Sequence, residues 1–152
     1  MLETLKRELA RYRQRSFLDA LMAGCAVVAT ADGSVSLSER SRIDRIFESM
    51  HELDIFDPHE AVDRFNDFAE SIALDAERGR REALAEIDDQ ADDPARALLL
   101  LRACVAVSLA DGAVNEAERQ ALADIGDALA LPPASLEEAI ASLAQGRREV
   151  RS

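Results

Sequence analysis

The sequence predicts an all-α fold, a compact bundle of seven to eight helices, from three observations. Apolar residues recur at helical spacing, whereas alternating strand patterns and hairpin turns are missing. Aromatic residues make up only 4% of the chain, so the apolar set is mainly Ala, Leu, Val and Ile, which suit packed helices. Capping residues also mark several helix starts. At 152 residues a single domain is expected, because each half alone is too small to bury its apolar runs.

The first part of the chain predicts three helices. A polar, charged helix is expected over residues 2–14, followed by a helix over residues 16–31 that is apolar nearly all round and should be buried. Asp32–Gly33 ends the second helix, because Gly tolerates the left-handed conformation found there. Ser36–Glu39 reads as a capping box, in which each side chain bonds the other residue's backbone N–H. A third helix follows to about residue 52.

Two further helices precede a charged connector at residues 88–93. Asp57 is placed to cap the first of them, and Pro58 suits its first position. Residues 75–89 form the second, which we expect Gly79 to interrupt.

The second half repeats these signals. Asp93 caps a helix that Pro94 opens and that runs to about residue 110. Asn115–Glu118 caps the next helix, which runs to about 130. A last helix, capped at Ser135, is expected to end near Gly146.

These elements predict a basic N-terminal helical segment (1–15), an all-helical domain (16–146) and a basic tail (147–152). Within the domain we expect two related halves, 16–87 and 94–146.

An internal repeat supports the two halves. Residues 25–40 read CAVVATADGSVSLSER and residues 104–119 read CVAVSLADGAVNEAER, at a constant offset of 79. Each copy carries an Asp-Gly turn followed by a glutamate seven residues after the aspartate. The repeat thus places four carboxylates in two equivalent settings: Asp32, Glu39, Asp111 and Glu118.

The two aspartates need an explanation, because an acid beside the negative end of a helix dipole costs about 0.3–1 kcal/mol. Three groups can offset that cost: the N-terminus of the following helix, an arginine (Arg40 or Arg119), or a bound metal ion. The two glutamates already have a role as helix caps. Carboxylates with backbone carbonyls and water suit Ca²⁺, Mg²⁺ or Mn²⁺ better than Zn²⁺. The turns lack the twelve-residue pattern of an EF-hand.

The charge distribution argues against nucleic acid as a partner. The net charge is −12, whereas phosphate binding needs a dense Lys/Arg surface. Residues 1–15 nevertheless carry five basic and two acidic side chains, and Leu2, Leu5, Leu9 and Tyr12 form one stripe. This segment is either a solvated terminal helix or a docking element for an acidic membrane surface.

Other features bound the class of protein. Cys25 and Cys104 lie in apolar runs, where a thiol behaves as a small hydrophobe, so neither a disulfide nor a reactive thiolate is expected. We expect no secretory signal and no membrane span, and therefore a cytoplasmic protein. Neither a nucleophile elbow nor a phosphate-binding loop occurs, so we predict no catalytic site.

Four segments of the chain resemble the TerB family of tellurite-resistance proteins. They are ARYRQRSF (10–17), ATADGSVSLSER (29–40), ELDIFD with VDRFNDF (52–68), and SLADGAVNEAER (108–119). Their order and spacing make the resemblance specific. It departs in one place, since Asn115 caps the second turn where Ser36 caps the first.

The resemblance implies a compact, non-enzymatic, all-helical cytoplasmic protein of the tellurite-resistance and stress-response system. It implies partners in that system, including a membrane protein of the TerC type at the inner face of the membrane. It also implies divalent metal binding by Asp32, Glu39, Asp111 and Glu118. The alternative is an interaction module that docks at the membrane through residues 1–15, with the acids only as caps.

Overall fold

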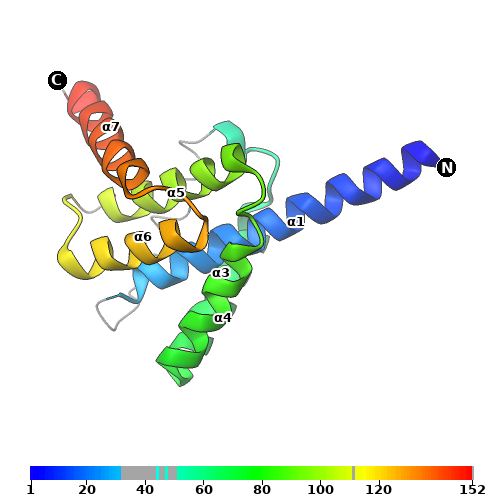
Figure 1. Ribbon diagram of the computed structural model, residues 1–152, viewed down its shortest axis with the longest axis horizontal. Coiled ribbons are helices and arrows are strands. Elements are labelled where there is room, and N and C mark those ends of the chain that lie inside the picture. The colour runs from blue at the N-terminus through cyan, green and yellow to red at the C-terminus, as the bar shows by residue number, and fades with distance from the viewer. Residues whose placement is uncertain (32–43, 45–46, 48–50, 111, 152) are drawn as a thin grey trace.

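The computed structural model describes residues 1–31, 44, 47, 51–110 and 112–151, and this part of the chain is helical, with no strand. The all-α prediction is confirmed, with six α-helices rather than seven to eight in the described ranges (Figure 1). The elements are α1 (Leu2–Ala29), the 3-10 helix η1 (His51–Leu53), α3 (Pro58–Leu74), α4 (Ala76–Asp88), α5 (Pro94–Leu109), α6 (Glu116–Ala128) and α7 (Pro133–Arg151). The helix expected from Ser36 lies mostly outside the described residues, although Asp44 and Phe47 are helical.

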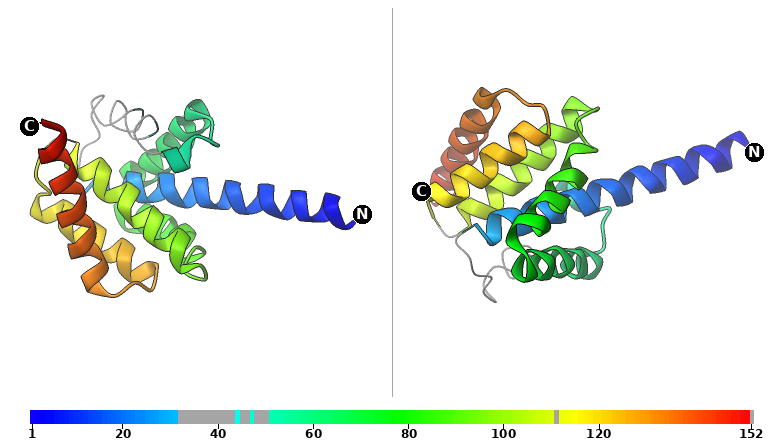
Figure 2. Two further views of the ribbon diagram at one scale, coloured as in Figure 1. Left: turned by 90° about the horizontal axis from the view of Figure 1, so that it is seen from above. Right: turned by 60° about the horizontal axis from the view of Figure 1, so that its bottom comes forward.

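A single helix, α1, replaces the two that the sequence predicted over residues 2–14 and 16–31. Residues 10–17, where the two predicted helices meet, contain neither glycine nor proline. The helical hydrogen bonds therefore continue from the polar part of α1 into its apolar part. Residues 2–15 are all exposed and extend away from the body in each view (Figures 1 and 2). We call residues 2–15 the arm.

The second half of α1 forms the centre of the body. From Phe17 to Ala29 every residue except Asp19 is buried, as the predicted all-round apolar pattern required. This half packs against α3, α4, α5 and α6, while α5 also packs against α6 and α7. The buried half of α1 is therefore shared by most of the other helices.

Side-chain caps start the helices where the sequence predicted them. The Asp57 carboxylate accepts from the His59 backbone N–H at 3.0 Å, and the Asp93 carboxylate accepts from the Ala95 and Arg96 N–H groups. Each satisfies a donor that the first helical turn leaves without a partner. Asp75, which the sequence analysis did not single out, ends α3 and caps α4 by accepting from Arg78 N–H at 3.2 Å.

Gly79 does not interrupt α4, contrary to the prediction. A side chain there would place Cβ 2.6 Å from the backbone N and Cα atoms of Ile72, so only glycine permits this approach of α4 to α3. Because one residue, Asp75, connects the two helices, their axes must already be close at Gly79. The glycine is thus a packing requirement between helices and not a break within one.

The last helix also differs from the prediction. It begins at Pro133, whose fixed φ suits a first helical position, and it continues through Gly146 to Arg151. Before it, Ala130 takes a left-handed φ of 57° and closes α6, with Leu131 N–H bonded to Gly126 C=O at 3.0 Å. This is the hydrogen bond of a Schellman cap, which glycine usually provides.

Two glycine substitutions should have opposite effects on stability. We expect Gly79→Ala to lower the free energy of unfolding by about 1–3 kcal/mol, because its Cβ would overlap the Ile72 backbone. Gly126→Ala, where a Cβ would meet nothing within 4 Å, should raise it by about 0.5–1 kcal/mol. Urea denaturation of both variants measures the difference, and equal effects would contradict the packing role of Gly79.

Candidate functional site

Of the four acids predicted to bind metal, the structure describes one. Asp32, Glu39 and Asp111 lie outside the described residues, so whether the four come together stays a prediction. Glu118 is in the first turn of α6 and forms the predicted capping box. Its carboxylate accepts from the Asn115 N–H at 3.1 Å, and its own N–H donates to the Asn115 side chain at 2.8 Å.

The structure describes the residues on either side of Asp111 in the second Asp-Gly turn. Gly112 has φ +126°, a conformation that a side chain would strain, and its N–H donates to Leu109 C=O at 3.0 Å. Arg119 was one candidate to neutralise Asp111, but its Nη1 donates to Glu137 on α7 at 2.6 Å. Glu137 thus supplies a carboxylate to this guanidinium. Asp111 itself lies outside the described residues, so the group that offsets its charge stays a prediction.

The described parts of the chain contain no group of three or more His, Cys, Asp or Glu side chains that could hold a metal ion. His51 Nδ1 lies 2.8 Å from the Asp54 carboxylate, at an exposed position.

The acids between α1, α3 and α4 face an arginine, since Arg64 Nε lies 3.3 Å from Asp19. Desolvation raises the pKa of Asp19 and, with the charges of Asp19 and Asp89, also that of Glu86.

The two repeated cysteines meet inside the body. Cys25 on α1 and Cys104 on α5 are both buried free thiols. A hydrogen bond with Cys25, together with burial, raises the pKa of the Cys104 thiol well above its ordinary value. Gly24 permits the contact, because a Cβ there would lie 2.6 Å from Cys104 Sγ. The repeat thus places equivalent residues at the crossing of α1 and α5, where the thiols are shielded from solvent.

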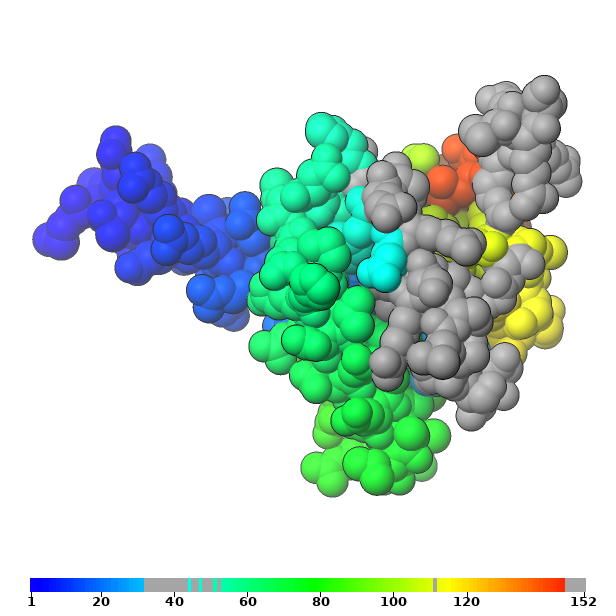
Figure 3. Space-filling model, turned by 180° about the vertical axis from the view of Figure 1, so that it is seen from behind, coloured from blue at the N-terminus to red at the C-terminus, as the bar shows by residue number. Residues whose placement is uncertain are grey.

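The arm is an exposed feature with a defined chemical character. Figure 3 shows it projecting from the rest of the molecule. Its basic side chains are all exposed, and so are four large apolar side chains. The apolar positions, at spacings of three and four, share one face of the helix: Leu2, Leu5, Leu9 and Tyr12.

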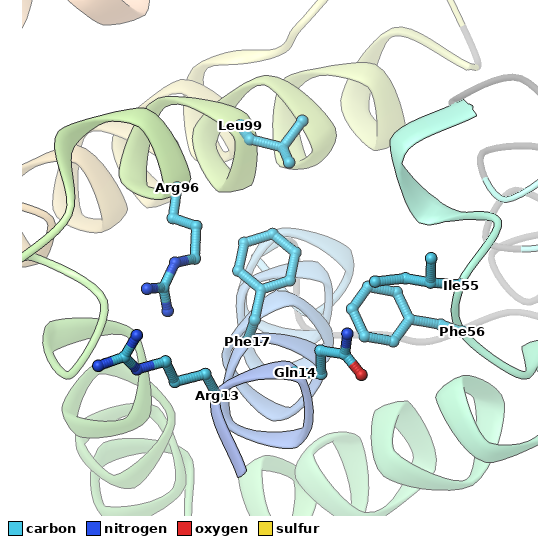
Figure 4. A pocket seen from close by; sticks show the side chains of 7 residues that line it. All are labelled: Arg13, Gln14, Phe17, Ile55, Phe56, Arg96 and Leu99. Atoms are coloured by element: carbon cyan, nitrogen blue, oxygen red, sulfur yellow. The ribbon is translucent and has the colours of Figure 1, made fainter. Parts of the chain in front are cut away.

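A pocket of about 290 Å³ lies where the arm joins the body (Figure 4). Its lining comes from α1, from the segment after η1 and from α5: Arg13, Gln14, Phe17, Ile55, Phe56, Arg96 and Leu99. This pocket was not predicted from the sequence, since its three segments are far apart in the chain and none carries a ligand-binding motif. The only signal was the apolar pair Ile55–Phe56 beside a predicted helix start.

Comparison with known proteins identifies the family. A family model described as "Tellurite resistance protein TerB" matches residues 18–141, which is most of the chain. The chain belongs to the TerB family. A "Tellurium resistance protein TerB" from Alcaligenes sp is 34% identical to it over 100 residues, which cover 66% of this chain and 82% of the relative. No solved structure shows significant similarity to this chain.

The TerB match begins at Leu18, one residue after the buried part of α1 begins at Phe17. The arm therefore lies outside the matched range, and the pocket combines residues from both sides of that boundary. Among the described residues of this TerB-family chain, no helix combines the length and apolar character needed to cross a membrane.

The buried cysteines of this TerB-family chain should be unreactive. A raised pKa leaves less Cys104 thiolate at a given pH, and burial excludes reagents from both thiols. We expect the native chain at pH 8 to react with Ellman's reagent far more slowly than the chain unfolded in guanidinium, where both thiols should react. Rapid labelling of two thiols per native chain would contradict the buried contact.

Proposed function

We propose that this chain acts in tellurite resistance as a non-enzymatic docking protein that binds an acidic membrane surface through its basic arm. The observation that carries the proposal is that every residue from 2 to 15 is exposed, although the rest of the same helix is packed in the body. A leucine face flanked by basic side chains suits a helix that lies in the headgroup region of a bilayer. Docking there would bring the TerB-family body beside a membrane protein such as the TerC-type partner.

The body holds the arm in a binding-ready conformation. A free helix of this length is marginal in water, because nucleation is costly. Here the buried half of α1 supplies the nucleus, so the arm continues a helix that tertiary packing already stabilises. The entropy of folding the arm therefore need not be lost at the moment of binding.

The charge distribution favours binding of the arm, and not of the body, to an anionic surface. The arm region, residues 1–15, has a net charge of +3 and the remainder of the chain −15. At 1.5 Å per residue, the arm is about 21 Å long, more than twice the Debye length of about 8 Å at physiological ionic strength. The tip is therefore largely screened from the acidic body. A surplus of three charges contributes about 3 kcal/mol at an anionic surface, so binding should be reversible and sensitive to salt.

Neutralising the arm should abolish docking. We expect the wild type to co-sediment with phosphatidylglycerol-containing vesicles and the Lys6→Gln/Arg7→Gln/Arg11→Gln variant to bind roughly 100-fold more weakly, because about 1 kcal/mol is lost per charge. Melting temperatures should be equal, since the three side chains are exposed.

The matched control is Arg78→Gln/Arg81→Gln, which removes two exposed charges from α4 and should leave vesicle binding unchanged. Docking through the arm would be refuted if the wild type did not bind anionic vesicles, or if both variants lost the same vesicle affinity. Binding to native membranes but not to pure lipid would instead assign the arm to a membrane protein.

We propose a second function, divalent metal binding at the Asp-Gly turns, for one reason. The sequence places an aspartate after each of the two apolar helical runs, where the negative end of the helix dipole favours positive charge nearby, and a bound cation would supply it. Asp32 and Asp111 would be the primary ligands, while Glu39 and Glu118 would contribute only if they left their capping roles. Oxygen ligands favour Ca²⁺, Mg²⁺ or Mn²⁺.

Thermal melting with added metal tests the turns. If Ca²⁺ or Mn²⁺ binds, saturating ion should raise the melting temperature by several degrees, and Asp32→Ala/Asp111→Ala should abolish the rise. Asp92→Ala, at an exposed position of the connector, is the control that should keep it. Glu118→Gln preserves the capping chemistry and removes only the charge, so an unchanged shift would confine Glu118 to its cap. The absence of a wild-type shift would eliminate this function.

A further inference from the structure

The pocket at the base of the arm combines an apolar lining with two guanidinium groups. Figure 4 shows Arg13 and Arg96 extending toward one another on one side of the Phe17 ring, and Ile55 and Phe56 on the other side. Phe17 and Phe56 are stacked, with ring centroids 6.0 Å apart. Leu99 reaches the same space from α5. One end of the pocket is therefore cationic and the remainder apolar.

The cationic end has spare hydrogen-bonding capacity. Within the described part of the chain, Arg13 has no acidic partner. Arg96 donates from Nε to Asp93 at 3.2 Å, which leaves its two terminal nitrogens for another acceptor. Asp93 already offsets one of the two guanidinium charges, so these three groups keep a net charge of +1. A single anion that accepts N–H groups from both arginines would neutralise that charge.

The apolar end is open to a ligand. Ile55 is 66% exposed although it lines the pocket, which leaves a large aliphatic side chain in contact with water. The cavity of about 290 Å³ is at the small end for ligand sites. With about 30 Å³ per water-sized group, it holds about ten such groups, comparable to a chain of eight to ten carbons.

We propose that this pocket binds an aliphatic monoanion, with a carboxylate or phosphate head between Arg13 and Arg96 and a hydrocarbon tail against Phe17, Phe56 and Leu99. Free fatty acids and membrane lipids share this chemistry. The site is distinct from the arm charges proposed to bind the membrane surface, because it does not use Lys6, Arg7 or Arg11.

Isothermal titration with decanoate tests the pocket directly. The wild type should bind one decanoate per chain, and decanol, which has the same tail without the charge, should bind at least about 10-fold more weakly. Arg13→Gln should weaken decanoate binding on the order of 10-fold. Ile55→Asp should abolish it, because the new carboxylate would repel the anion.

Two matched controls separate the pocket from general effects. Arg7→Gln removes an arm charge outside the pocket, and Leu74→Asp changes an apolar side chain that is 89% exposed. Both should bind decanoate as the wild type does. Arg13→Gln, Ile55→Asp and Arg7→Gln should melt at the wild-type temperature because the substituted side chains are exposed. Leu74→Asp places an acid in the last turn of α3, so it should melt slightly lower. No decanoate binding, equal affinity for decanol, or equal losses in the controls would overturn the proposal.

Competition distinguishes the two sources of ligand. If decanoate displaces the chain from phosphatidylglycerol vesicles, the pocket takes part of a membrane lipid; if both bind together, it takes the free acid. The Lys6→Gln/Arg7→Gln/Arg11→Gln variant should lose vesicle docking and keep decanoate binding. The arm and the pocket can therefore fail independently of one another.

Discussion

The structure depends on burying the apolar half of α1. Phe17, Leu18, Leu21, Met22, Val27 and Val28 are each at most 5% exposed. Their burial is worth roughly 10 kcal/mol, which is comparable to the whole stability of a small domain. Because α3, α4, α5 and α6 all contact α1, loss of this helix would leave each of them with an unpaired apolar face.

The same burial accounts for the exposed features. The arm is helical because it extends a helix that the body holds, and the pocket forms where that helix leaves the body between α5 and the segment after η1. The crossing of α1 and α5 also brings the repeated cysteines together at Gly24. One packed helix thus positions the arm, the pocket and the thiol pair, and the functions proposed here depend on its geometry more than on any catalytic motif.

Much of the fold could be predicted because its signals are local. The caps at Asp57, Asp93 and Asn115 act on backbone groups within three residues, so the sequence is enough to place them. The prediction failed where distant contacts decide. Gly79 suggested a helix break, but the close approach of α3 requires a residue without a side chain at this position of α4. Gln90 lies in the connector that was predicted from its charge, yet it is buried and its Nε2 donates to Ser16 at 2.9 Å.

The sequence by itself determined the helical class, the repeat, the TerB resemblance and the basic character of the N-terminal segment, because composition, spacing and charge are properties of the chain. The sequence also indicated four acids as metal ligands. The structure describes one of them, Glu118, which caps α6 as its spacing predicted. Only the tertiary structure decided that Gly79 lies against the Ile72 backbone and that Arg13 and Arg96 share a pocket. The reason is that contacts between segments far apart in the chain depend on how the helices pack, which no local pattern specifies.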